Sequence, residues 1–305
     1  MTHHDHHLHD APSRTDPTGT TNIRRRYEAE LVRRFKRVRS LIFEALVTND
    51  VLGIGVNSVS ARVFQSAFGD QAPAREAFGF QRSGRKVSAF MEWLRQEQAA
   101  EILGIIQGTP LSQAAETAWQ NVYIDSAYQK GIRDAGERLR QGGATVRETW
   151  VNGAFNRPIH ADRLGLIYTR AYSDLSGITD EMDKQISRVL AQGMAEGRGP
   201  QYIARQVASR VDAIGIVRAR VLARTETIRA HAEATLNSYR EAKVEGVRVM
   251  AEFTTAGDDS VCSECEALEG REYEIDKADG IIPVHPNCRC AWLPSVSAPE
   301  GIILE

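Results

Sequence analysis

Cys262-Ser263-Glu264-Cys265 is followed, nineteen residues further on, by His285-Pro286-Asn287-Cys288-Arg289-Cys290, and these stretches contain all four cysteines of the chain. Zinc prefers four thiolate or imidazole ligands in a tetrahedron, and a C-x2-C turn can present two sulfurs to one ion. The two stretches offer five candidate ligands, one more than a single tetrahedral site needs. We expect Cys262, Cys265 and Cys288 to take part, with His285 or Cys290 as the fourth ligand.

The segment around these cysteines has few large apolar residues and several turns, so it cannot bury much hydrophobic core of its own. A structural zinc site contributes roughly 10–16 kcal/mol of apparent binding free energy in small peptides. That exceeds the net stability of about 5–15 kcal/mol that is typical of a whole domain. A structural zinc ion is therefore the favoured cofactor, and two disulfides or packed, reduced thiols are the alternatives.

The expected compartment also favours a metal over disulfides. The chain has no run of about 18 apolar residues that would form a transmembrane helix, so we expect no membrane contact. Its N-terminus is polar and lacks the apolar core of a secretory signal. We therefore expect the protein to fold in a reducing cytoplasm, where clustered cysteines bind metal more often than they form disulfides.

Composition and hydrophobic periodicity predict a mainly α protein with a small C-terminal α+β Cys/His-rich domain. Of the 305 residues, 42% are hydrophobic and 7% aromatic, and the formal net charge is -2. This whole-chain charge does not by itself indicate nucleic-acid binding. Apolar residues at helical spacing predict helices over residues 23–48, 84–107 and 111–141, and a helical block over 160–245.

Local signals divide the helical block. Thr179, followed by acidic residues, predicts a helix start. Gly197-Arg198-Gly199 predicts a helix end, and Pro200 suits the first position of the next helix. Gly246 predicts the end of the block. Beyond it, residues 247–255 nearly alternate and predict a strand, with residues 272–275 as a short partner strand.

These boundaries suggest four regions along the chain. They are a disordered His-rich tail over residues 1–22, a helical N-terminal region over 23–159, the Cys/His-containing domain over 160–296 and a short tail over 297–305. The first tail carries His3, His4, His6, His7 and His9. This tract suits metal binding, although a solvated tail with adventitious metal affinity is the more common explanation.

The helix predicted over residues 23–48 is strongly basic outside one apolar stripe. The stripe consists of Leu31, Phe35, Val38, Ile42 and Leu46. Such a helix can bind a phosphate backbone or an acidic protein surface, and the alternative is a solvated face on an ordinary core helix. The candidate nucleic-acid or partner-binding residues are Arg24, Arg25, Arg26, Arg33, Arg34, Lys36 and Arg37.

Two catalytic patterns are weaker alternatives. His231-Ala232-Glu233 followed by Cys262-x-x-Cys265 imitates the zinc deaminase signature, but Val261 stands where that signature has proline. His231 also lies inside a long predicted helix. His285-Pro286-Asn287 superficially suits a His-Asn-His nuclease, but the sequence offers no separate metal set with its own base. We therefore expect no enzyme. The alternatives are a zinc-dependent nucleic-acid enzyme, nuclease or deaminase-like, and a DNA-binding module that uses the basic helix.

An ordered series of motifs resembles the phage head morphogenesis proteins, the family of phage Mu protein F and related minor head proteins. The motifs are Arg224-Thr225-Glu226-Thr227, Tyr239, Gly246-Val247, Phe253-Thr254-Thr255, Asp258-Asp259-Ser260-Val261-Cys262-x-x-Cys265, Leu268-Glu269-Gly270 and Pro283-Val284-His285-Pro286-Asn287-Cys288-Arg289-Cys290. The resemblance covers roughly residues 160 to 294. The family commonly has Trp at the position of Phe253 and Pro at that of Ile282, so we expect local packing to differ there.

The resemblance implies a low-copy minor head (minor capsid) protein that acts in head assembly at or near the portal, in DNA packaging or in delivery. The implied partners are the portal protein and the major capsid or scaffold protein, with packaged DNA as a further one. The implied location is the virion, and the host cytoplasm during assembly.

The family brings no established catalytic residues, and we interpret Arg224 and Glu226 as structural. Glu226 could pair with Arg229 or Arg220, and Arg224 could bind a carbonyl in the Cys/His end.

Overall fold

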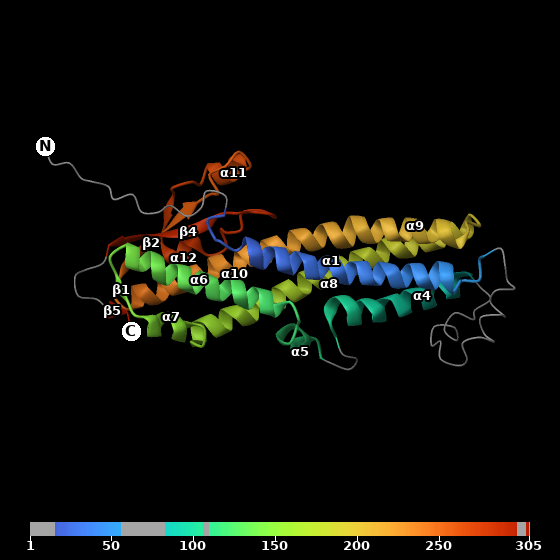
Figure 1. Ribbon diagram of the computed structural model, residues 1–305, viewed down its shortest axis with the longest axis horizontal. Coiled ribbons are helices and arrows are strands. Elements are labelled where there is room, and N and C mark those ends of the chain that lie inside the picture. The colour runs from blue at the N-terminus through green and yellow to red at the C-terminus, as the bar shows by residue number, and fades with distance from the viewer. Residues whose placement is uncertain (1–15, 56–82, 106–109, 298–302, 305) are drawn as a thin grey trace. The chain divides into compact units, whose positions relative to one another are not determined.

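The computed structural model describes residues 16–55, 83–105, 110–297 and 303–304 (Figure 1). The predicted fold class is confirmed, because the described chain is mostly helical and a small mixed region near its C-terminal end carries the Cys/His cluster. The chain divides into two compact units. Unit 1 comprises residues 1–27, 120–170 and 221–305, and unit 2 comprises residues 28–119 and 171–220. The histidines of the predicted tail lie outside the described residues.

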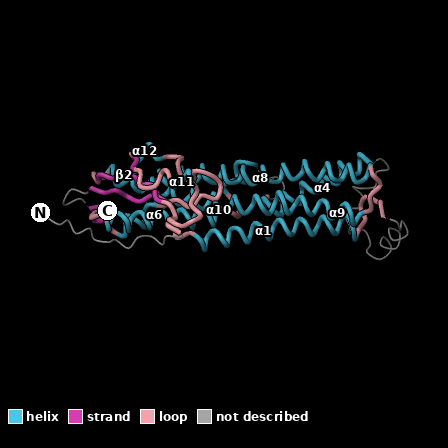
Figure 2. Tube along the Cα trace, turned by 90° about the horizontal axis from the view of Figure 1, so that it is seen from above, coloured by secondary structure: helices cyan, strands magenta, loops and turns pink. Residues whose placement is uncertain are grey.

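Unit 2 is built from long helices whose axes run alongside one another (Figure 2). Its described elements are most of α1 (Thr21–Phe43), the π-helical turn η1 (Glu44–Thr48), α4 (Ser83–Gln98), the π-helical turn η3 (Ala99–Leu103), α5 (Leu111–Glu116), the later part of α8 (Pro158–Ala195), α9 (Pro200–Arg210), η4 (Val211–Ile216) and the start of α10 (Val217–Val244). The apolar stripe predicted for α1 is buried throughout.

Unit 1 combines helices with short strands. Its described elements are α6 (Asn121–Gln141), β1 (Thr145–Val146), α7 (Glu148–Ala154), the first part of α8, most of α10, β2 (Arg248–Thr254), α11 (Ser263–Glu266), β3 (Glu272–Tyr273), α12 (Ile275–Ala278), β4 (Ala291–Ser297) and β5 (Ile303–Leu304). One hydrophobic core joins most of these elements, and its largest buried side chains include Trp150, Tyr239, Phe253 and Trp292.

The sheet of unit 1 has the order β3-β2-β4, and both pairings are antiparallel. The predicted strands over 247–255 and 272–275 correspond to β2 and β3. In the register of β2 and β4, Phe253 lies opposite Trp292. The rings of Phe253 and Tyr273 both meet the Trp292 ring edge-on, with centroids 5.7 Å away. This aromatic cluster fixes the strand that directly follows the Cys288-Arg289-Cys290 segment.

Helix α10 lies in the interior of unit 1, and it buries polar as well as apolar side chains. Three of its hydroxyl groups donate to backbone carbonyls four residues earlier. These hydrogen bonds are Thr227 to Ala223 (2.7 Å), Thr235 to His231 (2.8 Å) and Ser238 to Ala234 (2.9 Å). The helix thus satisfies part of its buried polar surface internally, as Ser and Thr commonly do in helices.

The helix start predicted at Thr179 is wrong, because α8 continues without a break from Pro158 to Ala195. The Thr179 hydroxyl donates to the carbonyl of Ser176 at 2.7 Å instead of capping a helix. Buried Leu175, Ile178 and Met182 carry the apolar stripe of α8 through this point. Packing of that stripe outweighs a local capping signal, since tertiary burial contributes most of the stability of a helix.

Other helix boundaries follow the local signals. Gly197 has a left-handed φ of 64° at the end of α8, and Pro200 begins α9. Gly246 has a φ of 100° just after α10. The stretch predicted as one helix over 111–141 is divided into α5 and α6. Trp119 lies in the break, and its indole N–H donates to the Ile102 carbonyl at 2.8 Å.

Gly131 of α6 is a test of how closely α6 and α10 pack. A Cβ atom at Gly131 would lie 2.5 Å from the His231 carbonyl oxygen and 2.8 Å from the Ala234 Cβ. We expect Gly131→Ala to lower the free energy of unfolding by about 1–3 kcal/mol, because overpacking outweighs the gain in helix propensity. Urea denaturation measures this change. The matched control is Gly165→Ala in α8, where nothing lies within 4 Å, and it should stabilise by up to about 1 kcal/mol. Equal effects of the two substitutions would contradict the close packing.

Candidate metal centre

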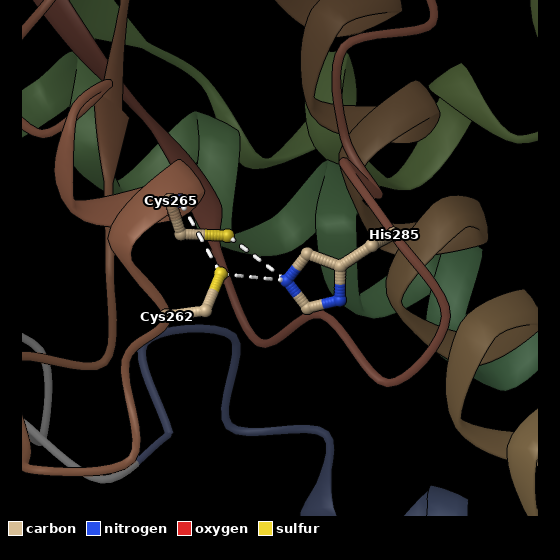
Figure 3. A group of neighbouring side chains, drawn as sticks. All are labelled: Cys262, Cys265 and His285. Carbon is tan, nitrogen blue, oxygen red and sulfur yellow. Dashed lines mark hydrogen bonds between the residues drawn. The ribbon is translucent and has the colours of Figure 1, made fainter.

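The first half of the Cys/His cluster is the turn from Cys262 to Cys265. Cys262 is the N-cap residue of α11, and its Sγ accepts a hydrogen bond from the backbone N–H of Cys265 at 3.4 Å. A second turn hydrogen bond joins the Glu266 N–H to the Cys262 carbonyl at 2.9 Å. This geometry brings both sulfurs to the same side of a single turn (Figure 3).

The second half is the turn from His285 to Cys288. The backbone N–H of Cys288 donates to the His285 carbonyl at 3.1 Å. Asn287 takes the left-handed conformation, with a φ of 68°, a conformation that Asn adopts more readily than most residues. The backbone N–H of Asn287 donates to the Thr225 hydroxyl at 3.4 Å. The turn is thereby attached to α10.

The two turns face each other across the cluster. His285 Nε2 lies 3.1 Å from Cys262 Sγ and 3.2 Å from Cys265 Sγ (Figure 3). Two groups of potential ligand atoms lie within 4.8 Å of one another: Cys262, Cys265 and His285 form one, and Cys265, Cys288 and Cys290 form the other. Cys265 belongs to both groups, so the five side chains that the sequence predicts form two overlapping groups of three.

The residues of the cluster lie in different surroundings, which shift their pKa values in different directions. A hydrogen bond from the Cys265 backbone N–H lowers the pKa of Cys262, whereas burial raises the pKa of Cys265 to about 12. A hydrogen bond from Cys290 lowers the pKa of Cys288 to about 5, and the same contact, together with burial, raises that of Cys290. The hydrogen bond to the Pro286 carbonyl raises the pKa of His285.

The cluster fits a metal ion such as zinc. Cys265, Cys288 and Cys290 are almost fully buried, with at most 3% of each residue exposed. A cavity of about 30 Å³ adjoins the cluster, and Cys262, Cys265, His285 and Cys290 are among its lining residues. A space of this size accommodates one ion or water and no organic cofactor. Sulfur and imidazole donors are the set that zinc prefers, and a bound zinc would cross-link the two turns.

An ion pair connects the two halves of the cluster. The Arg289 guanidinium donates two hydrogen bonds to the Asp258 carboxylate, at 2.5 and 2.6 Å. Asp258 also accepts from the backbone N–H of Ser260, just before the Cys262 turn. Arg289 lies between Cys288 and Cys290 in the chain, so this fork-like pair connects the segments that carry the sulfurs.

Comparison with known families found a family model that matches the part of the chain that contains this cluster. Residues 184–293 match the family model described as phage Mu protein F like protein. This segment is similar to the phage Mu protein F-like family. The match runs from the later part of α8 to β4 and includes all five residues of the Cys/His cluster. The Mu F-like proteins are phage head proteins that are generally structural. No significant match to a curated protein or to a solved structure was found.

Within the Mu F-like segment, Glu226 is completely buried on α10. It forms ion pairs with Arg229 at 3.2 Å and Arg170 at 3.5 Å. Arg220, the other partner considered from the sequence, pairs with Glu28 at 3.1 Å. Arg224 is half-buried, and the neighbouring Thr225 makes the contact with the Cys/His end.

The basic residues of α1 fall into two sets. Arg33 and Arg34 bind Glu30, Arg34 also stacks over the Trp119 ring, and Arg37 lies 3.8 Å from Glu101. Burial opposes ionisation of the Asp16 carboxylate, but hydrogen bonds from Thr21 and Thr18, with a smaller effect of the nearby Arg24 charge, lower its pKa overall. The other set is exposed and has no ion pair among the described residues; it consists of Arg25, Arg26 and Lys36.

His231 does not join the Cys/His cluster that a deaminase-like site would require. It is completely buried in α10, and its Nε2 lies 2.8 Å from Asp134 Oδ2 of α6. Among the described residues, the groups of potential metal ligands do not include it. His231 is therefore placed as a helix-packing residue of unit 1.

Sequence reasoning missed several residues that support the cluster. Arg138 of α6 donates to the carbonyls of Trp292 at 2.6 Å and Pro17 at 2.8 Å, and so attaches β4 to α6. The Asp258–Arg289 pair was also missed. Both residues of that pair stand in the family-like motifs, which was the available signal for it, and nothing in the local sequence marks Arg138.

Zinc content tests the metal centre directly. We expect about one zinc per purified chain, because the two groups of ligand atoms share Cys265 and a zinc ion takes four such ligands. Cys265→Ser should remove most of this zinc, since Cys265 belongs to both ligand groups. Elemental analysis measures the content. Ser263→Ala, an exposed position of the same turn, is the matched control and should retain the metal. A wild-type protein without near-stoichiometric zinc would rule out the site.

The buried His231–Asp134 pair predicts a pH dependence of stability. Burial lowers the pKa of His231 below its ordinary value of 6.5. The unfolded chain therefore binds a proton more readily, and stability falls as the pH drops below about 6.5, by up to about 1.4 kcal/mol per pH unit. Urea denaturation between pH 7.5 and 5 should show this slope in the wild type.

His231→Gln is the comparison for this pH dependence, since its amide can still donate to Asp134 without titrating. We expect a shallower slope over the same pH range. Identical slopes in the two proteins would show that His231 does not titrate differently on folding.

Proposed function

We propose that this protein is a minor head protein of a phage, which acts in head assembly at or near the portal and takes part in DNA packaging or delivery. The Mu F-like match over residues 184–293 carries this proposal. The proposed partners are the portal protein and the major capsid or scaffold protein, and the proposed location is the virion. No helix in the described part of the chain is long and apolar enough to span a membrane.

The Cys/His cluster supports a structural role within this function. Structural zinc sites are closed by four protein ligands, whereas catalytic sites keep one position for water or substrate. In this cluster two groups of three donor side chains share Cys265, so a further sulfur or imidazole lies beside either group as a fourth ligand. The bound zinc would hold the His285–Cys288 turn against the Cys262–Cys265 turn. We therefore propose that the metal is a structural cross-link within the Mu F-like segment and not a catalyst.

The exposed basic residues of α1 support a contact with an assembly partner. Arg25, Arg26 and Lys36 project from one helix and are not neutralised within the described chain. Basic side chains of this kind contact acidic protein surfaces or phosphates. We assign them to a protein partner at the portal vertex, because the formal net charge of the chain is -2 and gives no general attraction to DNA.

Particle content tests the proposed function. In heads purified from infected cells, the protein should be present at a few copies per particle and should co-purify with the portal protein. Quantitative mass spectrometry of purified heads measures both. Its absence from heads and from assembly intermediates would contradict the proposal.

Charge reversal tests the α1 contact. The triple variant Arg25→Glu, Arg26→Glu and Lys36→Glu should keep the wild-type thermal midpoint but enter heads several-fold less, since these side chains make no ion pair in the described chain. The control reverses an equal number of exposed charges elsewhere, at Arg205, Arg210 and Arg218. If both variants entered heads to the same extent, the basic residues of α1 would not be part of the interface. A steep, salt-dependent loss of DNA binding in the α1 variant alone would identify DNA as its partner instead.

A further inference from the structure

Opposite charges are concentrated in two segments of the chain. Residues 251–280 contain ten acidic and two basic residues, whereas α1 contains eight basic and two acidic residues. The rest of the chain contains equal numbers of acidic and basic residues. The small formal net charge of -2 therefore conceals two large local excesses of opposite sign.

The acidic segment brings three carboxylates near one another. Glu252 of β2 lies directly opposite Glu272 of β3 in the antiparallel register. Glu269 lies beside the end of β2, where its carboxylate accepts hydrogen bonds from the Thr255 backbone N–H at 2.6 Å and from the Thr254 hydroxyl at 3.3 Å. We call Glu252, Glu269 and Glu272 the glutamate group.

The glutamate group is not neutralised within the described part of the chain, since none of its members forms an ion pair with a described residue. Glu269 and Glu272 are exposed. Burial, together with the charges of Glu272 and Glu269, raises the pKa of Glu252. Like charges directly opposite each other on neighbouring strands are destabilising. The group therefore has an electrostatic cost in the single chain that incoming cationic side chains would remove.

A single metal ion does not fit the glutamate group. Among the described residues, the only side chains whose ligand atoms lie within 4.8 Å of one another in groups of three or more are those of the Cys/His cluster. The three carboxylates are thus too widely spaced to hold one small cation together. They suit separate lysine and arginine side chains on a protein surface.

Helix α1 presents a matching row of cations. Arg25 and Lys36 are exposed and form no ion pair with the described residues. They are eleven residues apart, which places them on one face of the helix, three turns and about 16 Å from each other. Each copy of the chain therefore carries both a basic helix face and an acidic group that lacks a partner, and the two surfaces have complementary charge.

We propose that copies of this chain associate head to tail, with the basic face of α1 in one copy against the glutamate group of the next. This inference rests on the proposed contact of α1 with a protein partner, and it names a second copy of the chain as that partner. The contact joins two different surfaces, so its repetition produces a ring or an open array. A small ring agrees with the few copies per particle that the proposed function requires.

Analytical ultracentrifugation of the purified full chain tests this association. At about 50 mM salt the wild type should associate as its concentration rises, and at about 500 mM salt it should be monomeric, because salt screens exposed charges. A wild type that stays monomeric at low salt would overturn the proposal. Association that high salt does not weaken would also contradict it, because the contact would then not depend on charge.

Neutral substitutions separate the two sides of the contact. The glutamate variant, Glu269→Gln with Glu272→Gln, and the helix variant, Arg25→Gln with Lys36→Gln, should each associate about tenfold more weakly than the wild type. A mixture of the two variants should form a dimer and grow no further, because each variant keeps one unaltered surface and these two surfaces complement each other. Mixed assemblies no larger or more abundant than those of either variant alone would contradict the head-to-tail contact.

The control variant, Glu148→Gln with Asp162→Asn, removes two exposed acidic charges elsewhere, which form no ion pair with the described residues. It should associate like the wild type, and an equal loss of association in this control would show that the total charge matters and not the glutamate group. The salt dependence of the wild type needs no substitution, so it decides the case in which a variant fails to fold. If the wild type is monomeric and charge reversal on α1 still lowers entry into heads, this inference fails while the proposed function stands.

Discussion

The enclosure of α10 is the constraint on which unit 1 depends. A helix buried on nearly all sides needs partners for its polar groups, because an unpaired buried group costs about 1–3 kcal/mol. His231 forms a hydrogen bond with Asp134 of α6, and Glu226 forms an ion pair with Arg170 of α8 at 3.5 Å. The hydrogen bond has direction and a narrow range of distance, unlike apolar contacts, and the ion pair adds an electrostatic attraction to α8. Together they specify how α10 lies against α6 and α8, beyond what close packing alone requires.

The Cys/His end is attached to this helix. Thr225 of α10 accepts a hydrogen bond from the turn that carries His285, and Arg138 of α6 binds the carbonyl of Trp292 at the start of β4. The His285–Cys288 turn and the strand after it are thus attached to a rigid core at two points. The segment that joins the two turns packs Ile275 and Ile282 into the same core, and a metal ion that binds both turns would add a cross-link to this packing. The Asp258–Arg289 pair then orients the segments and leaves the cross-linking to the metal.

The sequence was informative where a local signal determines the structure. The left-handed glycines at 197 and 246 end α8 and α10 because few other residues adopt that conformation, and the spacing of cysteine and histidine brought all five cluster residues together. The Thr179 signal failed because it is weak compared with the packing of a continuous apolar stripe. Strand β4 was missed because it contains Pro294 and follows a cluster that resembles a loop. Its strand structure depends on pairing with β2, which is distant in sequence.

The family match and the folding unit have different boundaries. The match begins in α8 and ends in β4, at residue 293, whereas the partners that enclose α10 include α6, which lies well before it. A fragment restricted to residues 184–293 would lack Asp134, so His231 would lose its hydrogen-bonding partner. It would also lack Arg138, which holds Trp292, and Gly131, whose missing side chain lets the backbone of α6 approach α10. The earlier helices are therefore part of the same core as the Mu F-like segment.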